Sequence, residues 1–175
     1  PLGSAPIFGL SGKQLKSFKP IPKWTTMLDR YRVEAAKDIR CREGRQGQCP
    51  YTEWRALIEQ LKSRDRITQI LKTNAFANQW KYTKDVLNWG VSDYWETPGE
   101  FFQKSGDCED YAIVKFMTLR ALGFENEDLL ITAVMDKNLG VGHAITLVLL
   151  NGRTLVLDNQ VKGAIPIERV HHYRP

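Results

Sequence analysis

The stretch "SGDCEDYAIVKFMTLRALGF", residues 105–124, places one cysteine at the start of a helical pattern. Asp107 is a suitable N-cap, because its carboxylate can accept from the free N–H groups of a first helical turn. Apolar residues then recur at helical spacing, and Gly123 follows where a C′ glycine commonly ends a helix. The pattern predicts a helix over residues 107–122, with Cys108 in its first turn.

Three acids surround this cysteine: Asp107, Glu109 and Asp110. A thiol reacts as its thiolate, and neighbouring negative charge disfavours the thiolate. The helix N-terminus acts in the opposite direction, because its dipole favours an anion. Asp110 also fits a capping box with Asp107, which accounts for acids here without any chemistry. These residues alone leave open whether Cys108 is a nucleophile, a metal ligand or a core thiol.

The pattern changes after the glycine that ends this helix. The segments "LLITAVMD" (129–136), "HAITLVLL" (143–150) and "TLVLDN" (154–159) are rich in β-branched and large aliphatic residues and indicate strands. Between the last two lies "NG", residues 151–152, the strongest short hairpin signal. Because helices come first and antiparallel strands second, the predicted fold class is α+β.

The remainder of the chain divides into two short N-terminal segments and one domain. Residues 1–4, "PLGS", look like the remnant of a cleaved tag, and residues 5–22 indicate an extended arm. Residues 23–175 suffice for a single domain, helical over 23–122 and β over 128–170. Further helices are predicted over 23–40, from near Pro50, from Ser63 or Asp65, over 84–89 and over 98–103.

The composition excludes several classes of protein. Of the 175 residues, 42% are hydrophobic and 26% charged, as in ordinary globular domains, and no apolar run could cross a bilayer. The net charge of +5 comes from basic residues interleaved with acids, which indicates a solvated face rather than a nucleic-acid surface. Zinc is not expected, because the sequence has neither a CxxC nor an HExxH motif.

The other two cysteines, Cys41 and Cys49, lie close together in a polar loop, "RCREGRQGQCP". One local pair and one single cysteine predict a small disulfide loop and a separate thiol at Cys108, with unpaired loop thiols as the alternative. A disulfide would place the protein in an oxidising compartment such as the bacterial periplasm.

The hairpin register predicts a contact between a histidine and a carboxylate. If "NG" forms a two-residue turn, Ile145 lies opposite Asp158, and His143 is a diagonal neighbour of Asp158 on the same face, roughly 7–8 Å away. Such a carboxylate can orient an imidazole that acts as a general base. Together with Cys108, the pair would supply a nucleophile, a base and an orienter. A structural histidine is the alternative for His143.

Three segments, "DYWETPGEFFQKSGDCEDYAIVKFMTLRALGF", "GHAITLVL" and "LDNQ", resemble the bacterial transglutaminase-like cysteine proteinases, in particular those of the LapG type. The resemblance extends from about Trp24 to Gln160. It implies a papain/transglutaminase-like core with the nucleophile at a helix N-terminus packed on an antiparallel sheet. It also implies an endopeptidase in which Cys108 attacks a peptide carbonyl, His143 carries the proton and Asp158 orients His143.

The resemblance further implies a biological role. Proteases of this type lie in the periplasm and cut the N-terminal region of a large surface adhesin near a pair of alanines, which frees the adhesin and disperses biofilm. An inner-membrane receptor of the LapD type sequesters the protease when the receptor binds cyclic di-GMP. The protease itself is expected to bind neither the nucleotide nor nucleic acid.

The resemblance also implies dependence on calcium, for which Asp107, Glu109 and Asp110 would offer oxygen ligands. A bound divalent ion would convert local repulsion into a positive field beside Cys108. Two other functions stay open at this point. One is a transglutaminase or acyltransferase that uses the same Cys–His–Asp triad, and the other is a non-enzymatic module that retains a relic site.

Overall fold

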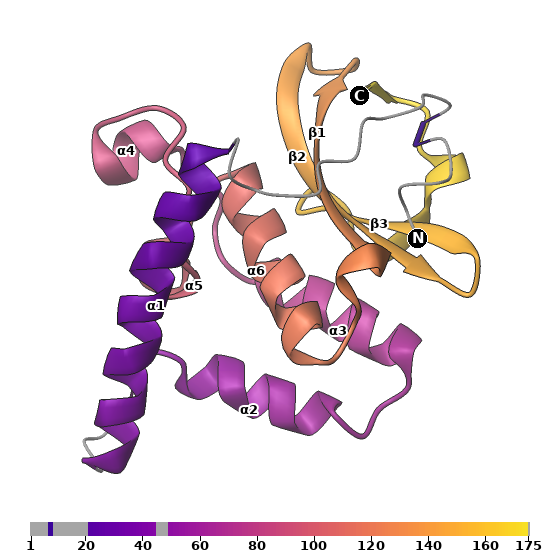
Figure 1. Cartoon of the computed structure of the whole chain (residues 1–175). Helices are drawn as coiled ribbons and strands as arrows, with labels where there is room; N and C mark the ends of the chain where they lie inside the picture. Colours follow the sequence, from indigo (N-terminus) through magenta and orange to yellow (C-terminus); the bar gives the residue numbers. More distant parts are fainter. Residues whose placement is uncertain (1–6, 9–20, 45–48, 175) are drawn as a thin grey trace.

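Six α-helices precede five strands within the described residues of the computed structural model, which are 7–8, 21–44 and 49–174 (Figure 1). The helices are α1 (Pro22–Glu43), α2 (Thr52–Leu61), α3 (Arg66–Ala77), α4 (Asp85–Trp89), α5 (Pro98–Lys104) and α6 (Cys108–Ala121). The strands are β1 (Leu129–Asp136), β2 (Val141–Leu150), β3 (Arg153–Leu157), β4 (Ala164–Pro166) and β5 (Tyr173–Arg174). Two 3-10 helices, Asn126–Asp128 and Ile167–Arg169, lie between these elements. The order of elements is the α+β arrangement predicted from the sequence.

The N-terminal segments fall mostly outside this description. The tag remnant predicted at residues 1–4 lies outside the described residues, as does most of the arm predicted at 5–22. Helix α1 already begins at Pro22, inside the predicted arm, because the fixed φ of proline suits a first helical turn. Among the described helices, none is both long and apolar enough to cross a membrane.

The start of α2 differs from the prediction. A helix was predicted from near Pro50, but α2 begins at Thr52. Thr52 Oγ1 accepts from Cys49 N–H at 3.0 Å and donates to Cys49 O at 2.9 Å, which holds Pro50 in a turn before the helix. The structure joins Cys49 to Cys41 in α1 by a disulfide, the pairing expected from their spacing. This bond ties α1 to the segment that leads into α2.

Other helix ends follow the capping signals. Of the two N-caps considered for α3, the structure uses Asp65, whose Oδ1 accepts from Thr68 N–H at 3.0 Å. Helix α6 is followed by Gly123 at φ +83°, a left-handed conformation that glycine adopts without strain. Gly123 marks the C-terminal end of α6, and the helix begins at Cys108, directly after its N-cap residue Asp107.

The strands form one antiparallel sheet in the order β4-β3-β2-β1-β5. The predicted turn is confirmed, with Asn151 at φ +50° and Gly152 at φ +77°, and Leu150 lies opposite Arg153. Strand β3 ends at Leu157, earlier than the predicted end at residue 159. The short strands β4 and β5 were not predicted, because two or three residues carry no periodic pattern.

Strand β2 is buried on both faces, which explains its nearly continuous apolar sequence. On one face it packs against α6, where Thr146 Oγ1 donates to Ala112 O at 3.0 Å. A second cluster covers the other face and comprises Val134, Ile145, Leu147, Val156, Val170 and Tyr173. The sheet therefore lies between α6 and the C-terminal segment that contains Val170 (Figure 1).

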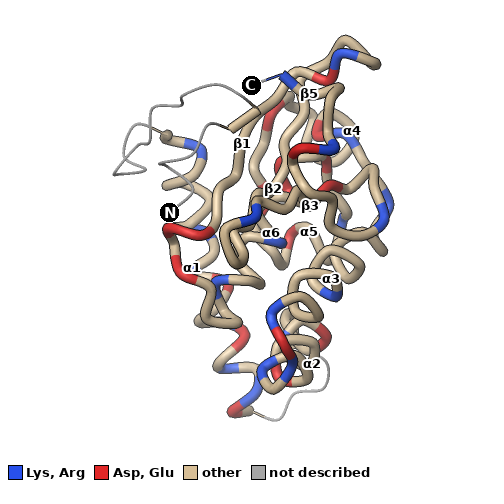
Figure 2. Tube along the Cα trace, turned by 90° about the vertical axis from the view of Figure 1, so that its right-hand side faces the viewer, with Lys and Arg blue, Asp and Glu red and all other residues tan. Residues whose placement is uncertain are grey.

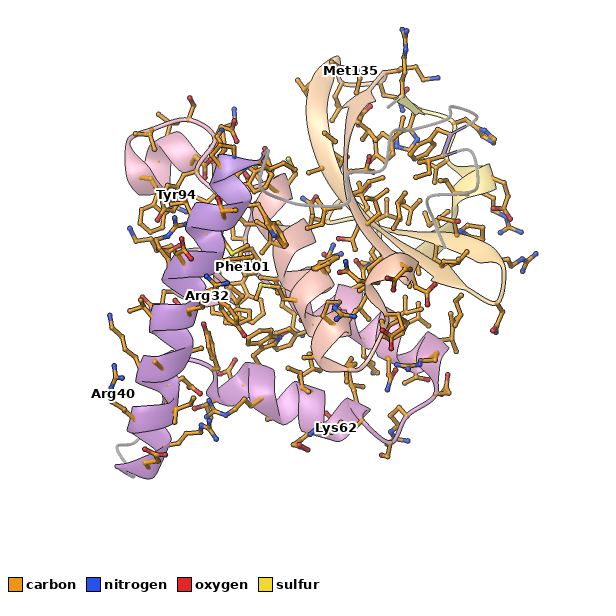
Figure 3. All side chains as sticks on the ribbon, viewed as in Figure 1. Arg32, Arg40, Lys62, Tyr94, Phe101 and Met135 are labelled. Carbon is orange, nitrogen blue, oxygen red and sulfur yellow. A yellow bond between two sulfur atoms is a disulfide. The ribbon has the colours of Figure 1, made fainter. Side chains whose placement is uncertain are left out.

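The helical half packs around aromatic side chains. Phe101, labelled in Figure 3, is fully buried, and its ring packs against those of Trp80, Phe102 and Tyr111. Met135, by contrast, lies at the exposed tip of the β1–β2 hairpin (Figure 3). Basic and acidic residues alternate along the traced helices and hairpins (Figure 2), and in this view the described basic residues do not collect on one element.

Candidate active site

The first turn of α6 is fixed by a buried carboxylate. Asp110 Oδ2 accepts from Asp107 N–H at 2.9 Å, and its Oδ1 accepts from Glu96 N–H at 2.7 Å. Asp110 is completely buried, and a Cβ at Gly106 would lie 2.3 Å from its Oδ2. Glycine is therefore required at Gly106 by close packing. The predicted capping interaction is present in the bond from Asp107 N–H to Asp110.

Cys108 is buried against Ala112 of the same helix and Ala144 of β2. Its Sγ donates to Glu109 Oε2 at 2.9 Å. Burial raises the pKa of the thiol far above its usual value, and the charge and hydrogen bond of Glu109 raise it further. In this state the thiol is protonated at neutral pH. Cys108 packs against Ala144, which directly follows His143 in the chain. Among the described side chains, however, no hydrogen bond joins the thiol to His143.

The contact predicted between His143 and Asp158 is confirmed. His143 Nε2 lies 2.9 Å from Asp158 Oδ1, and both residues are buried. Asp158 follows the last residue of β3, where Gln160 N–H donates to Oδ1 at 2.9 Å and Tyr173 OH donates to Oδ2. Because Nε2 faces Asp158, Nδ1 of His143 is the ring nitrogen left to exchange a proton with a nucleophile.

The charge of Asp158 is stabilised by its surroundings. Burial alone would raise the pKa of Asp158, but hydrogen bonds from His143, the Gln160 N–H and Tyr173 hold it below its usual value. Lys115, buried in α6, interacts electrostatically with Asp158, and burial lowers the pKa of this lysine to about 7. Asp158 is therefore ionised at neutral pH, as an orienting carboxylate must be.

The acids around Cys108 form two groups rather than the single group predicted. Asp107 and Glu109 lie with the thiol, their ligand atoms within 4.8 Å of one another. Asp110 instead lies with Asp85 and Glu96, likewise within 4.8 Å. The reason is the capping box, which turns Asp110 back toward the preceding loop while its neighbours face the thiol. The fold therefore separates Asp110 from Asp107 and Glu109, the two acids with which it was expected to bind calcium.

Both groups have the donor chemistry of a site for a hard cation. Three carboxylate oxygens have no hydrogen-bond partner among the described residues and are buried: Asp107 Oδ1, Asp85 Oδ1 and Glu96 Oε2. Burial, with repulsion from Glu109, raises the pKa of Asp107 to about 8, and burial raises that of Glu96 to about 7. Unpaired carboxylate oxygens are the ligands that calcium prefers, so these residues fit the ion.

Sequence reasoning missed Asp85 and Glu96. Asp85 lies in α4 and Glu96 in the loop before α5. The density of acids in "SDYWETPGE", residues 92–100, was a local hint for Glu96, but this stretch does not include Asp85. Asp85 Oδ2 accepts from Tyr94 N–H at 2.5 Å, and Glu96 Oε1 accepts from Trp89 Nε1 at 2.6 Å. These bonds hold α4 against the loop before α5, and the bond from Glu96 N–H to Asp110 Oδ1 joins that loop to the start of α6. No sequence period encodes this association.

A model of the bacterial transglutaminase-like cysteine proteinases matches residues 40–173, which include Cys108, His143 and Asp158. The chain belongs to this family. It is a cysteine proteinase, and its α+β fold is the transglutaminase-like fold expected from the sequence.

Solved structures of LapG from Legionella pneumophila are similar to this cysteine proteinase. A calcium-bound form is 32% identical over 72% of this chain and 71% of that one, with a TM-score of 0.65. Another LapG structure and an EGTA-treated form are each 28% identical over 85% of this chain, cover 81% and 78% of those chains, and have the same TM-score of 0.65. Among curated proteins, none matches this chain.

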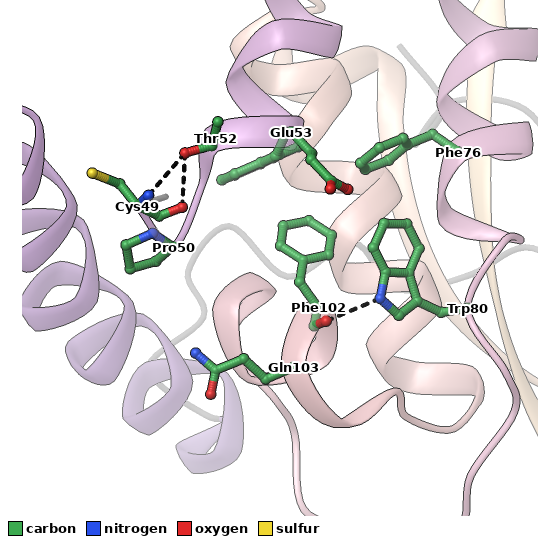
Figure 4. A pocket seen from close by; sticks show the side chains of 9 residues that line it. Cys49, Pro50, Thr52, Glu53, Phe76, Trp80, Phe102 and Gln103 are labelled. Atoms are coloured by element: carbon green, nitrogen blue, oxygen red, sulfur yellow. Dashed lines mark hydrogen bonds between the residues drawn. The ribbon is translucent and has the colours of Figure 1, made fainter. Parts of the chain in front are cut away.

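A separate cavity lies in the helical half of the proteinase (Figure 4). Its volume is about 310 Å³, and its lining includes Trp54, Phe76, Trp80 and Phe102. Trp80 Nε1 donates to Phe102 O at 3.1 Å, which holds two of these rings together. The residues that line it include neither Cys108 nor the His–Asp pair, so this cavity is not the proposed catalytic site.

Proposed function

We propose that this chain is a calcium-dependent periplasmic cysteine endopeptidase that cleaves the N-terminal region of a large surface adhesin near a di-alanine site. Cleavage would release the adhesin and promote biofilm dispersal, and an inner-membrane LapD-type receptor of cyclic di-GMP would restrain it. The observation that supports the proposal best is the buried His143–Asp158 hydrogen bond beside a thiol at a helix N-terminus. The similarity to LapG structures supports a LapG-like cysteine proteinase, on which the proposed substrate rests.

The proposed chemistry follows from the residues on α6 and β2. Cys108 gives up its contact with Glu109, transfers its proton to His143 Nδ1 and attacks the peptide carbonyl carbon. The Cys108 N–H, in the first turn of α6, can donate to the oxyanion that forms. His143 then protonates the leaving amine, and water hydrolyses the thioester. Asp158 stays ionised and keeps the imidazole in the required tautomer.

Calcium would be held by Asp107 and Glu109, with Asp85, Glu96 and Asp110 as the adjoining carboxylates. The calcium-bound and EGTA-treated structures of LapG support calcium dependence, and the grouping of the acids supports these residues as the ligands. When bound, the ion supplies a positive field beside the thiol, where the protein alone supplies negative charge. Glu109 is the residue that connects the two functions, because it lies with Asp107 and also accepts from Cys108.

Calorimetric titration tests the calcium ligands. Asp107→Asn and Glu109→Gln are each expected to raise the Kd for Ca²⁺ about tenfold or more, because each removes one anionic ligand. Glu127→Gln is the matched control, since Glu127 is an exposed acid of the Asn126–Asp128 turn. Unchanged affinity in both Asp107→Asn and Glu109→Gln would place the calcium site elsewhere.

Cleavage of a defined substrate tests the proposed reaction. We expect the protein to cut an N-terminal adhesin fragment next to its di-alanine site, as read from the new N-terminus of the product. A fragment with both alanines replaced by valines is the control, and its cut at that position should disappear. Equal cleavage of the two fragments would refute the proposed specificity. Preferential transfer of the acyl group to an added primary amine would instead favour the acyltransferase function.

A further inference from the structure

Tyr173 in β5 contacts both members of the His–Asp pair. Its hydroxyl donates to Asp158 Oδ2, while His143 Nε2 lies 2.9 Å from the other oxygen, Oδ1. The centroid of its ring lies 5.5 Å from that of the His143 ring, with the two planes inclined by 41°. Tyr173 is only 5% exposed. The ring of Tyr173 therefore lies against His143, the proposed base, and its hydroxyl bonds to Asp158, the proposed orienting carboxylate.

The backbone around Tyr173 fixes where this hydroxyl lies. Strand β5 pairs with β1, with Tyr173 opposite Asp136, and Lys137 N–H donates to His172 O at 2.8 Å next to this pair. On its outer side the Tyr173 ring packs edge-on against Phe8 at 6.4 Å. Because pairing and packing both restrict the side chain, the hydroxyl is pre-organised for Asp158 rather than free to rotate to water.

Tyr173 also completes the hydrogen bonding of Asp158. Oδ1 interacts with His143 and the Gln160 N–H, whereas Tyr173 is the donor to Oδ2 among the described residues. Asn78 Nδ2 donates to the Asp158 carbonyl oxygen at 2.9 Å, so the backbone is held as well. Burial and the bond to Asp158 raise the pKa of Tyr173, so its hydroxyl remains a donor throughout the neutral range.

We infer that Tyr173 is a positioning residue of this proteinase, which holds Asp158 and His143 in the orientation that proton transfer requires. The inference rests on the proposed catalytic roles of Cys108, His143 and Asp158. Without the hydroxyl, Oδ2 would be a buried carboxylate oxygen lacking its donor, and the carboxylate could turn away from the imidazole. The effect would fall on the chemical step rather than on substrate binding, because Tyr173 acts through Asp158 and not on the peptide.

The test is Tyr173→Phe, which removes the hydroxyl and keeps the ring. We expect kcat to fall about tenfold, the size of one hydrogen bond to a charged group, with KM little changed. Independently of substrate, the ¹⁵N-histidine spectrum should show the His143 N–H that faces Asp158 at a shifted frequency. Tyr51→Phe is the matched control, because Tyr51 OH also donates to a carboxylate, that of Glu34, in the helical half.

Two outcomes would overturn the inference. One is a Tyr173→Phe protein with wild-type kcat and an unmoved His143 resonance. The other is a Tyr51→Phe protein with the same losses, which would reveal a general effect of removing a buried hydroxyl. Failure of the proposed function has a different signature, namely a wild-type chain that cleaves no adhesin fragment. The His143 resonance decides the role of Tyr173 in that case also.

Discussion

Replacement of Cys108 by alanine is expected to abolish cleavage of the adhesin fragment while the protein stays folded. The variant keeps His143 and Asp158 but has no atom that can form the thioester. The remaining groups could at most stabilise direct attack by water, so the rate should fall by about 10⁴-fold or more. Initial rates of product formation at saturating substrate and calcium measure the loss.

The fold should survive, because the change removes one sulfur atom from a position that already packs against two alanines. A thermal unfolding curve close to that of the wild type checks this. The double variant Cys41→Ala/Cys49→Ala is the matched control, since it removes two sulfurs without touching the site and should still cleave when folded. Cleavage retained by Cys108→Ala would show that another residue is the nucleophile.

The parts of this site that local chemistry dictates could be predicted from the sequence. The N-cap and the terminal glycine fix both ends of α6, which puts Cys108 in the first turn. A two-residue turn fixes which residues of the two strands lie opposite each other. Counting outward from the turn, over the eight residues from Leu150 back to His143, therefore predicted which residues lie near His143. The His143–Asp158 contact followed, although Asp158 lies just beyond the end of β3.

The parts that depend on tertiary packing could not be predicted. Asp110 resembles its neighbours in sequence, yet the capping box turns it toward Glu96 and away from the thiol. Asp85 and Glu96 reach the site only because α4 and the following loop fold against α6. Tyr173 reaches it through a two-residue strand at the far edge of the sheet, which has no sequence signal.

Removal of calcium with EGTA is expected to stop cleavage by the wild-type protein, and added Ca²⁺ is expected to restore it. The physical reason lies at Cys108, where burial and Glu109 raise the pKa of the thiol by more than the hydrogen bond from the Ala144 backbone lowers it. Burial is the largest contribution, and Glu109 adds both a charge and a hydrogen bond that favour the protonated form. A nucleophile in these surroundings needs positive charge that the described side chains next to it do not supply.

The measurement is the initial cleavage rate in EGTA, in EGTA saturated beforehand with Ca²⁺, and in EGTA with excess Mg²⁺. The protein should be active only in EGTA saturated beforehand with Ca²⁺. Mg²⁺ should not replace Ca²⁺, because it requires a small octahedral site and keeps its bound water. Glu109→Gln has two opposite effects on activity. It weakens the calcium site, and it also removes the negative charge that disfavours the thiolate of Cys108. We therefore expect this variant to need a higher Ca²⁺ concentration than the wild type and to keep a low rate in EGTA, where the wild type has none. A wild-type rate indifferent to EGTA would mean that the helix N-terminus and His143 activate Cys108 without a metal.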